Sequence, residues 1–379
     1  MTPERILIVG GGIAGLSLAA ALRQNGHAPE LVERAPAFGA AGAGIALSPN
    51  ALAMLRRLRI EEPVRDLGTE LSNAAVTDAA GRTLMHTDLG PLTAHFGPTL
   101  AIHRSDLHQV LLSACEGLTL RAGTTLASLR AHDEVVAVEF SDGQQREFDL
   151  VVGADGLHSQ VRRLVFGDRP AIYAGYTCWR LVCRAPIELV GLREMWGRGL
   201  RFGLVPLTQN RVYCFAVANA PAATPDPRSG RLERFRKRFA DFGGAVPAVL
   251  AELRSPDELI HNDLADLDEP VWHRGRVVLV GDAAHAVTPN MGQGAAMALE
   301  SSVLLAEALS ANEPLAERLA NWHARRHDRV RFIRNQSRRI GRVGHWENRA
   351  ACALRNGSLR LTPNRFAAAA LVRLASTPV

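Results

Sequence analysis

The chain has 379 residues, more than a single hydrophobic core usually organises, so two domains are expected. Hydrophobic residues make up 47% and charged residues 22%, which excludes a disordered or fibrous chain, and no apolar run reaches the roughly 18 residues of a membrane span. The net charge of +6 comes from arginines spread along the sequence without a recognised nucleic-acid-binding motif, so we expect no nucleic-acid partner.

The N-terminal segment predicts a parallel sheet covered by helices. Residues 5–10 have the pattern of a short buried strand, 13–25 of a helix and 29–34 of a second strand. Two further helices are predicted with Ser48 and Ser105 as their N-caps. The alternation of strand and helix indicates an α/β fold.

The sequence pattern changes at about residue 171, where strand-like segments with aromatic residues, joined by turns, predict a β-rich insertion. A buried strand at 276–282 and a helix at 293–309 then resume the first pattern, and an Arg-rich helical tail follows. We therefore expect a discontinuous Rossmann-like domain with an inserted β-rich substrate domain and a C-terminal helical segment. The expected boundaries are 1–70, 104–170 and 271–379 for the first domain and 71–103 and 171–270 for the second.

A glycine cluster lies between the first strand and the first helix. Gly10 permits a tight turn, Gly12 lets a diphosphate approach the backbone, and Gly15 lets the helix pack on the strand. Glu33 ends the second strand 18 residues after Gly15, where a carboxylate can bind an adenosine ribose and would repel a 2′-phosphate. This stretch predicts binding of FAD or NAD and does not distinguish them.

Two later segments carry a family resemblance. The first is Gly-Ala-Asp-Gly at 153–156, and the second is Gly-Asp-Ala-Ala-His at 281–285, followed by Pro289 and by Gly-Gln-Gly at 292–294. With the glycine cluster, they match in order and approximate spacing the single-component FAD-dependent aromatic hydroxylases. The chain thus resembles the para-hydroxybenzoate hydroxylase-like flavoprotein monooxygenases over nearly its whole length.

The resemblance implies a resident FAD and assigns positions to it. Asp282 would bind a ribityl hydroxyl, while Gly292 and Gly294 would bring backbone amides to the isoalloxazine edge at a helix N-terminus. Pro289 would shape the reactive face of the flavin, and residues 42–45, beginning at Gly42, would run beside the ribityl chain. The full set of expected cofactor-binding residues is Gly10, Gly12, Ala14, Gly15, Glu33, Arg34, Gly44, Ile45, Arg104, Leu126, Asp155, Gly156, Asp282, Pro289, Gly292 and Gly294.

The resemblance also implies the reaction. NADH or NADPH would reduce the flavin, O2 would form a flavin C4a-hydroperoxide, and this would hydroxylate a small, electron-rich aromatic substrate. Candidate substrate contacts are Tyr176, Trp179, Arg180, Arg201, Phe202 and Tyr213. Asn290 stands where the urate hydroxylases of the family carry an aspartate, which argues against urate and leaves an arginine-anchored aromatic acid as the broader expectation.

Other assignments stay open at this stage. An FAD-linked epoxidase or halogenase, a non-catalytic flavin-binding module and a soluble NAD-dependent dehydrogenase would each explain part of the pattern. No catalytic base is assigned; His285 is expected to be structural, and His323 and His327 to lie on a solvated helix face without a metal. Because no apolar signal segment follows the N-terminus, we expect a cytoplasmic protein, either monomer or homodimer.

Overall fold

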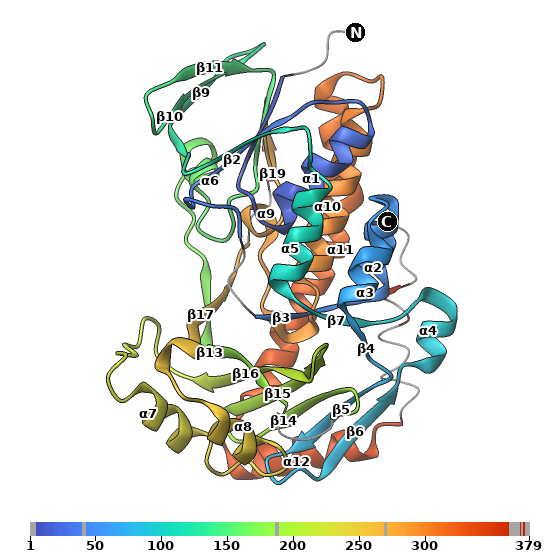
Figure 1. Cartoon of the computed structure of the whole chain (residues 1–379), viewed down its shortest axis with the longest axis vertical. Coiled ribbons are helices and arrows are strands. Elements are labelled where there is room, and N and C mark those ends of the chain that lie inside the picture. The colour runs from blue at the N-terminus through green and yellow to red at the C-terminus, as the bar shows by residue number, and fades with distance from the viewer. Residues whose placement is uncertain are drawn as a thin grey trace.

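The computed structural model describes residues 5–39, 43–185, 189–268, 271–363, 372 and 374–375. One end of the molecule is built on a six-stranded sheet in the order β18-β19-β12-β1-β2-β8 (Figure 1). Its strands are β1 (Ile6–Val9), β2 (Glu30–Glu33), β8 (Thr119–Ala122), β12 (Leu150–Gly153), β18 (His273–Arg274) and β19 (Val277–Leu279). β1 pairs in parallel with both β2 and β12, as predicted from the strand–helix–strand start.

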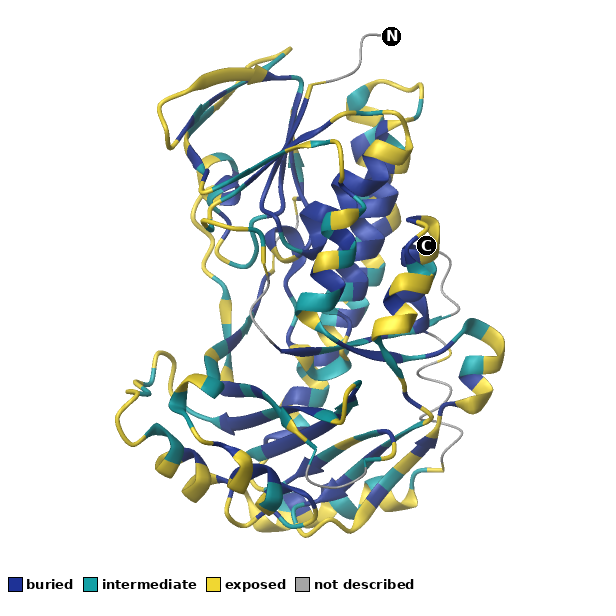
Figure 2. Cartoon of the chain, viewed as in Figure 1, coloured by how far each residue is buried: buried dark blue, intermediate teal, exposed yellow. Residues whose placement is uncertain are grey.

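Helices from both ends of the chain cover this sheet. They are α1 (Ile13–Gln24), α2 (Pro49–Arg57), α3 (Glu61–Leu67), α5 (Arg104–Ser113), α6 (Gln160–Phe166), α9 (Asp282–His285), α10 (Gly294–Leu309) and α11 (Leu315–Gly344). α1 packs on α10, which in turn packs on α2 and α11. The first domain is therefore completed by C-terminal sequence, and its helices near the sheet are largely buried (Figure 2).

The other end is a seven-stranded sheet in the order β17-β13-β16-β15-β14-β5-β6. Its strands are β5 (Asn73–Asp78), β6 (Thr83–Asp88), β13 (Ile172–Arg184), β14 (Leu192–Trp196), β15 (Leu200–Leu207), β16 (Arg211–Asn219) and β17 (Ile260–Asp266). Beneath it lie α7 (Arg231–Arg238), α8 (Val246–Glu252) and α12 (Arg349–Leu361) (Figure 1). This sheet is the expected β-rich insertion.

Smaller elements complete and connect the two ends. A hairpin sheet sits on the first domain, and another small sheet with one short helix lies between the domains (Figure 1). They are β9 (Leu126–Ala131), β10 (Val136–Phe140) and β11 (Gln145–Phe148), then β3 (Gly44–Leu47), β4 (Thr69–Glu70), β7 (Leu100–His103) and α4 (Gly90–Phe96). Two 3₁₀ turns are η1 (Pro256–Glu258) and η2 (Pro289–Met291).

The two faces of the seven-stranded sheet bury different side chains. We call the side toward β3 and η2 the inner face, and the side packed on α7 and α8 the outer face. Leu181, Phe202 and Leu204 pack with the helices on the outer face. Val205 and Tyr213 pack on the inner face against residues of the small sheet between the domains. Because side chains alternate along a strand, neighbouring residues serve opposite faces.

Three local expectations differ from the structure. Ser48 is the N-cap of α2 but makes no capping bond, because its hydroxyl donates to Asn50 instead. α5 begins one residue before Ser105, with His103 as N-cap. α12, expected within the 271–379 segment of the first domain, packs against β6 beneath the seven-stranded sheet. Among the described residues no helix is long and apolar enough to cross a bilayer.

Candidate flavin and substrate site

The glycine cluster forms a tight strand-to-helix turn at the end of β1. Gly10 has a φ of +113°, and a Cβ there would lie 2.5 Å from the carbonyl oxygen of Ala154. A Cβ on Gly15 would collide with the carbonyl oxygen of Gly10. These two positions therefore require glycine for close packing of β1, β12 and α1.

Four other expected glycines have open space in front of them. A Cβ on Gly12, Gly156, Gly292 or Gly294 would meet no atom within 4 Å. The N-termini of α1 and α10 also carry no side-chain cap, so their first amide groups stay available to a ligand. Open backbone beside two positive helix ends fits a diphosphate at α1 and the pyrimidine edge of a flavin at α10.

Glu33, the residue expected to bind the adenosine ribose, is held beside the glycine turn. Its carboxylate accepts hydrogen bonds from the backbone nitrogens of Gly11 at 2.7 Å and Ala35 at 2.9 Å. The side chain is half-buried and close to the glycine turn, as the ribose-binding role requires. Arg34 beside it is exposed.

The remaining adenosine-side residues are placed by backbone packing. Ala14 lies under Gly281, where a Cβ would approach its methyl group to 2.6 Å. Leu126 is buried, and its carbonyl oxygen accepts a 2.6 Å hydrogen bond from the Gln160 side chain. Ala14 thus joins the start of α1 to the 281–285 segment, and Leu126 joins β9 to α6.

Asp282 and Arg104 face each other although 178 residues separate them in the chain. Desolvation raises the pKa of Asp282, and the positive charge of Arg104 offsets part of the rise. Both residues nevertheless expose part of their surface to solvent. The arrangement leaves the Asp282 carboxylate free to accept a hydrogen bond from a ribityl hydroxyl.

Asp155 has a structural function in the chain itself. Its carboxylate accepts from the Ser159 hydroxyl at 2.5 Å and from the backbone nitrogens of Gln160 at 2.6 Å and Val161 at 3.0 Å. It therefore fixes the first turn of α6. Gly156, the next residue, has a φ of +78° and turns the backbone toward the open side.

The flavin-edge segment follows α9 and ends at α10. Pro289 is exposed, and Gly292, with a φ of +63°, reverses the chain before the helix begins. Across from it, Gly44 packs against the ring of Tyr213, and Ile45 is half-buried. Gly42 lies outside the described residues.

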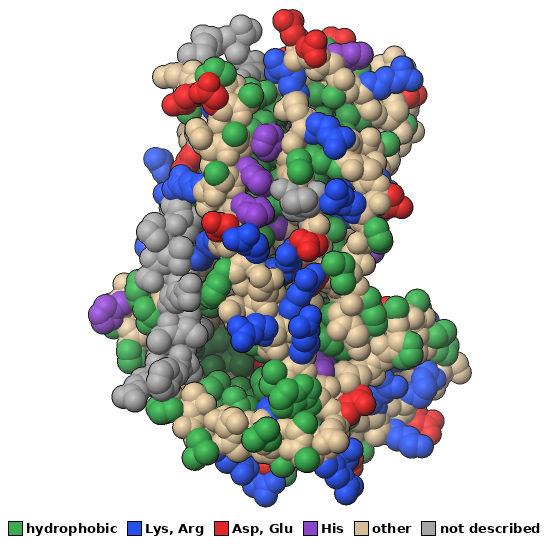
Figure 3. All heavy atoms as spheres, turned by 180° about the vertical axis from the view of Figure 1, so that it is seen from behind, with side chains coloured by type: hydrophobic (Ala, Val, Ile, Leu, Met, Phe, Trp, Pro, Cys, Tyr) green, Lys and Arg blue, Asp and Glu red, His purple; other side chains and the backbone are tan. Residues whose placement is uncertain are grey.

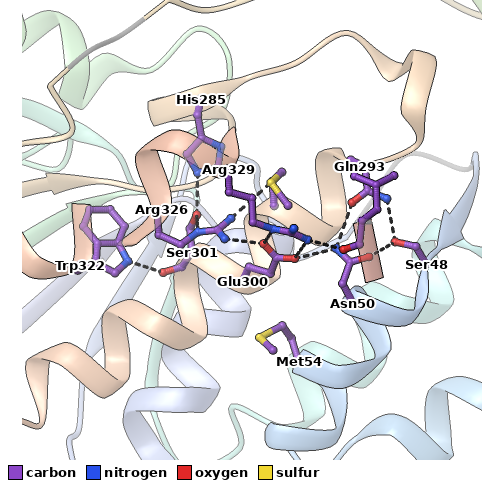
Figure 4. A network of polar contacts seen from close by, with 12 residues as sticks. Ser48, Asn50, Met54, His285, Gln293, Glu300, Ser301, Trp322, Arg326 and Arg329 are labelled. Atoms are coloured by element: carbon purple, nitrogen blue, oxygen red, sulfur yellow. Dashed lines mark hydrogen bonds and ion pairs between the residues drawn. The ribbon is translucent and has the colours of Figure 1, made fainter. Parts of the chain in front are cut away.

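A buried polar network anchors the start of α10 (Figure 4). The Gln293 side chain, directly before the helix, accepts from Asn50 at 3.1 Å and donates to the Ser48 hydroxyl at 2.9 Å. Asn50 also donates to the Glu300 carboxylate at 2.7 Å. The network links α2 to α10, so the orientation of the α10 N-terminus depends on side chains the motif does not include.

Glu300 lies between two arginines from α11. Arg326 donates to it at 2.5 Å and Arg329 at 2.9 and 2.8 Å, and both Glu300 and Arg326 are fully buried. Burial raises the pKa of Glu300, but the two arginines lower it more, so the carboxylate stays ionised. One acid against two arginines leaves a positive excess near the N-terminal half of α10.

His285 belongs to the same buried region. Its Nε2 lies 2.8 Å from the Ser301 hydroxyl. Burial, assisted by Arg326, lowers the pKa of His285 to about 3. The ring is therefore neutral near pH 7 and holds structure, as expected from the sequence.

On the inner face, Arg201 is the centre of a second network. Its guanidinium donates to Glu194 at 3.0 Å, to His345 at 3.0 Å and to the side-chain oxygen of Asn290, and the residue is only 2% exposed. Asn290 donates in turn to the Tyr176 hydroxyl at 2.9 Å. The charge of Arg201 is thus balanced by Glu194 within the protein.

Tyr176 completes a wall next to this network. Its ring stacks on His345 with centroids 4.1 Å apart and planes 6° apart. Tyr176 and His345 also border an open surface pocket of about 460 Å³ that includes Arg342 and Glu347. The Tyr176 side chain lies between this pocket and η2, because its ring borders the pocket and its hydroxyl accepts from Asn290 of η2.

Arg180 and Tyr213 lie together on the inner face nearer β3. Arg180 donates to the Asn262 side chain at 2.5 Å and also interacts with the Tyr213 hydroxyl. Burial raises the pKa of Tyr213, so its hydroxyl keeps its proton. Both partners of Arg180 are therefore uncharged.

Trp179 and Phe202 are not in this group. The Trp179 ring packs on Phe235 and Phe239 of the α7 region, and its Nε1 donates to Asp226 at 2.9 Å. Phe202 packs on Phe239 as well. Both side chains face the outer side because they are offset by one residue from Arg180 and Arg201, so we omit them from the substrate site.

Several residues of the site carried no sequence signal. His345 reaches Arg201 from the end of α11, Glu194 from the neighbouring strand β14, and Asn50 reaches α10 from α2. Glu300 did have a signal, because it lies seven residues after Gln293 and hence on the same face of the helix. The expectation that His323 and His327 lie on a solvated helix face was wrong, because both are half-buried and pack around Trp272, with centroids 4.9 and 6.0 Å from its ring.

Comparison with known proteins adds three findings. Residues 4–337 match the family described as FAD binding domain. The chain is 38% identical to 2-heptyl-3-hydroxy-4(1H)-quinolone synthase of Pseudomonas aeruginosa, covering 95% of this chain and 94% of that one, and 37% identical to aurachin C monooxygenase/isomerase of Stigmatella aurantiaca, covering 94% of each. The structure resembles HpxO of Klebsiella pneumoniae complexed with FAD and uric acid, with a TM-score of 0.91, 26% identity and coverage of 98% and 96%.

Proposed function

The chain belongs to the FAD binding domain family of flavoprotein aromatic hydroxylases and is an FAD-dependent monooxygenase, and we propose that its substrate is a 4-quinolone with a hydrocarbon side chain. Hydroxylation would occur at ring carbon 3, beside the carbonyl group. Two relatives at 37% and 38% identity over nearly the whole chain support this choice, since one makes a 3-hydroxy-4-quinolone.

The residues present fit FAD. Gly12 and the α1 N-terminus would hold the diphosphate, Glu33 the adenosine ribose, Asp282 the ribityl chain, and Gly292 and the α10 N-terminus the isoalloxazine. When bound, FAD supplies the redox and oxygen-transfer chemistry, with NAD(P)H as the reductant and O2 as the proposed oxygen source. The protein orients the substrate and excludes water.

The observation that carries the substrate proposal is the neutralised charge of Arg201. Its guanidinium already pairs with Glu194 and bonds to His345 and Asn290, so a substrate carboxylate would have to displace these partners. Replacing several buried charge-assisted bonds is unfavourable, whereas a neutral ring leaves them intact. The inner face therefore suits an uncharged bicyclic ring.

The surroundings of Tyr213 suit a hydrocarbon chain. A cluster of apolar side chains joins the inner face to the small sheet between the domains and to α4. Its buried members include Leu71, Leu89, Leu92, Val205 and Leu207, and its partly buried members include Phe96, Val182, Leu192 and Phe215. Such a lining binds an alkyl chain by burying its surface.

Arg180 and Tyr213 would contact the polar edge of the ring. A cation beside the 4-oxygen of a quinolone favours its oxyanion form, which raises the electron density at carbon 3. Arg180 can supply that cation because its partners Asn262 and Tyr213 are neutral. The same feature also favours a second candidate, an aromatic acid anchored on Arg180.

A substrate panel distinguishes the two candidates. Purified, FAD-loaded protein is incubated with NAD(P)H and either 2-heptyl-4(1H)-quinolone or 6-hydroxynicotinate, and NAD(P)H consumption and the oxygenated product are measured. We expect the quinolone to stimulate turnover and to gain one oxygen atom. Stimulation by the acid alone would overturn the quinolone proposal.

Glu194→Gln tests the role of charge balance. The substitution leaves Arg201 without its carboxylate partner, so aromatic carboxylates should bind roughly tenfold more tightly as inhibitors. Glu307→Gln is the control, because Glu307 near the C-terminal end of α10 forms an exposed pair with Arg57 and not with Arg201. Unchanged carboxylate affinity in Glu194→Gln would show that Arg201 does not face the substrate.

A further inference from the structure

Helix α12 presents an unusually apolar outer face. Leu361 is 83% exposed and Leu354 is 69% exposed, the two highest values for large apolar side chains among the residues that the structure describes. Seven residues separate them, so they lie two turns apart on one face of the helix. Trp346, shortly before the helix, is 37% exposed. Other exposed apolar side chains, such as Leu164, belong to other elements.

The helix is firmly held on its opposite side. Cys352 and Arg355 are buried, and Arg355 lies over the Trp196 ring at 5.3 Å and donates to the carbonyl oxygen of Gly197 at 3.0 Å. Asn348 caps the N-terminus by accepting from the backbone nitrogens of Ala350 and Ala351. The exposure of the leucines is therefore a property of a well-packed helix and not of a loosely attached one.

The charge of this face is predominantly positive. α12 contains Arg349, Arg355 and Arg360 and no acidic residue. Arg349 and Arg360 are exposed and lie on one side of the apolar stripe, and Arg360 also forms an ion pair with Asp78 of β5 at 3.5 Å. The neighbouring helix α7, in the same layer beneath the sheet, has five basic residues and one acid. Figure 3 shows Lys and Arg side chains along the lower edge of the molecule, where this layer lies.

We propose that the outer face of α12 binds the surface of an anionic phospholipid bilayer. Leu354, Leu361 and Trp346 enter the headgroup region, while Arg349 and Arg360 pair with lipid phosphates. A helix with an apolar stripe and a basic polar side is the pattern of interfacial binding, and each basic side chain adds attraction to an anionic leaflet.

A second copy of the chain is a poorer occupant. A two-fold contact places the same patch on both partners, so Arg349 and Arg360 would face the arginines of an identical helix without a carboxylate on α12 to balance them. An anionic lipid surface satisfies both the leucines and the arginines. The position of α12 at the end of the molecule, beneath the seven-stranded sheet, leaves this face accessible (Figures 1 and 2).

Binding to the bilayer surface would also bring the enzyme close to its substrate. This consequence rests on the proposed function, whereas the lipid-binding proposal does not. A quinolone with a hydrocarbon chain partitions into lipid, so an enzyme held at the bilayer meets it at high local concentration. The lipid-binding test below uses no substrate. Its outcome is therefore independent of whether the quinolone assignment holds.

The test is co-sedimentation of the full-length, FAD-loaded protein with vesicles. We expect binding to vesicles of phosphatidylglycerol and phosphatidylethanolamine, weakened by high salt, and much weaker binding to vesicles of phosphatidylcholine alone. Leu354→Ser combined with Leu361→Ser, and separately Arg349→Glu combined with Arg360→Glu, should each reduce the bound fraction at least about tenfold.

Matched variants make the result specific. Leu164→Ser removes an exposed leucine from α6, and Arg331→Glu reverses an exposed arginine on α11; both should leave vesicle binding unchanged. FAD content and the unfolding midpoint of every variant report that the fold is intact. Equal binding to both vesicle types, or unchanged binding by the α12 variants, overturns the proposal. A dimer that dissociates when the leucines are replaced would instead assign this face to a second copy.

Discussion

At the scale of single residues, Asp282 and Arg104 show how two ionisable groups create a binding position. Desolvation raises the pKa of Asp282, and the positive charge of Arg104 offsets only part of that rise. The exposed carboxyl oxygens can accept a hydrogen bond from a ligand in either protonation state. Arg104 therefore favours the ionised form of Asp282 without restoring its ordinary pKa.

Asp282→Ala should weaken FAD binding by roughly tenfold or more, because a hydrogen bond to a charged group contributes about 1.5–3 kcal/mol. The measurement is a titration of FAD-free protein with FAD, followed by quenching of flavin fluorescence. Asp268→Ala is the control, since Asp268 is exposed and pairs with Arg334 instead of Arg104. An unaltered dissociation constant in Asp282→Ala would remove that residue from the flavin site.

Residues that the local backbone conformation requires could be predicted from the sequence. Residues that reach the site from distant segments could not. Gly10 and Gly15 could be identified because a tight strand-to-helix turn needs glycine wherever it occurs. Two partners of Arg201 could not, because Asn290 comes from η2 and His345 from the end of α11, 89 and 144 residues away. Trp179 could have been separated from Arg180 by strand alternation alone, since adjacent residues point to opposite faces.

At the scale of elements, the start of α10 depends on a neighbouring helix. Its N-terminal amides are the groups expected at the flavin edge, and no side chain caps them. Instead Gln293, Asn50 and Glu300 bind one another beneath the first turn. The direction of the helix end is thus set by α2 and by the two arginines of α11 behind Glu300 (Figure 4).

Asn50→Ala should loosen this helix end. The substitution leaves the buried side-chain oxygens of Gln293 and Glu300 without one donor, which costs about 1–3 kcal/mol of the free energy of unfolding. We expect a lower urea midpoint together with weaker FAD binding, measured on the same preparation. Asn335→Ala, on the exposed side of α11, is the control. A lower midpoint with unchanged FAD affinity would limit the network to stability.

Element types followed from the sequence more readily than element positions. The buried period of residues 5–10 and 13–25 predicted β1 and α1, and Asp142-Gly143 marks the β10–β11 hairpin, where Gly143 has a φ of +83°. The place of α12 was not predictable, because the helix packs on β6 and its Arg355 lies over the Trp196 ring and donates to Gly197, all more than 100 residues earlier. A helical pattern indicates which face of the helix is buried but not which element covers that face.

At the scale of the whole molecule, buried neutral histidines join parts that are distant in the chain. His285 sits between α10 and α11, and its pKa is lowered to about 3 by burial and by Arg326, with Glu300 opposing. His345 bonds Arg201 of the seven-stranded sheet, and burial and the positive charges of Arg201 and Arg355 lower its pKa to about 3. Each ring lies at a junction and accepts no proton there near pH 6.

This makes the folded protein sensitive to mild acid. Below pH 6.5 the unfolded chain protonates both histidines while the folded chain does not, so the unfolded state binds more protons and stability falls as the pH falls. The loss is about 2 kcal/mol per histidine between neutral pH and pH 5. His285→Gln and His345→Gln cannot titrate, so urea unfolding of the double variant should depend less on pH over this range. His95→Gln, at an exposed position in α4, should keep the wild-type slope. If the double variant and the wild-type protein lose equal stability between pH 7 and 5, the acid sensitivity originates in the carboxylates instead.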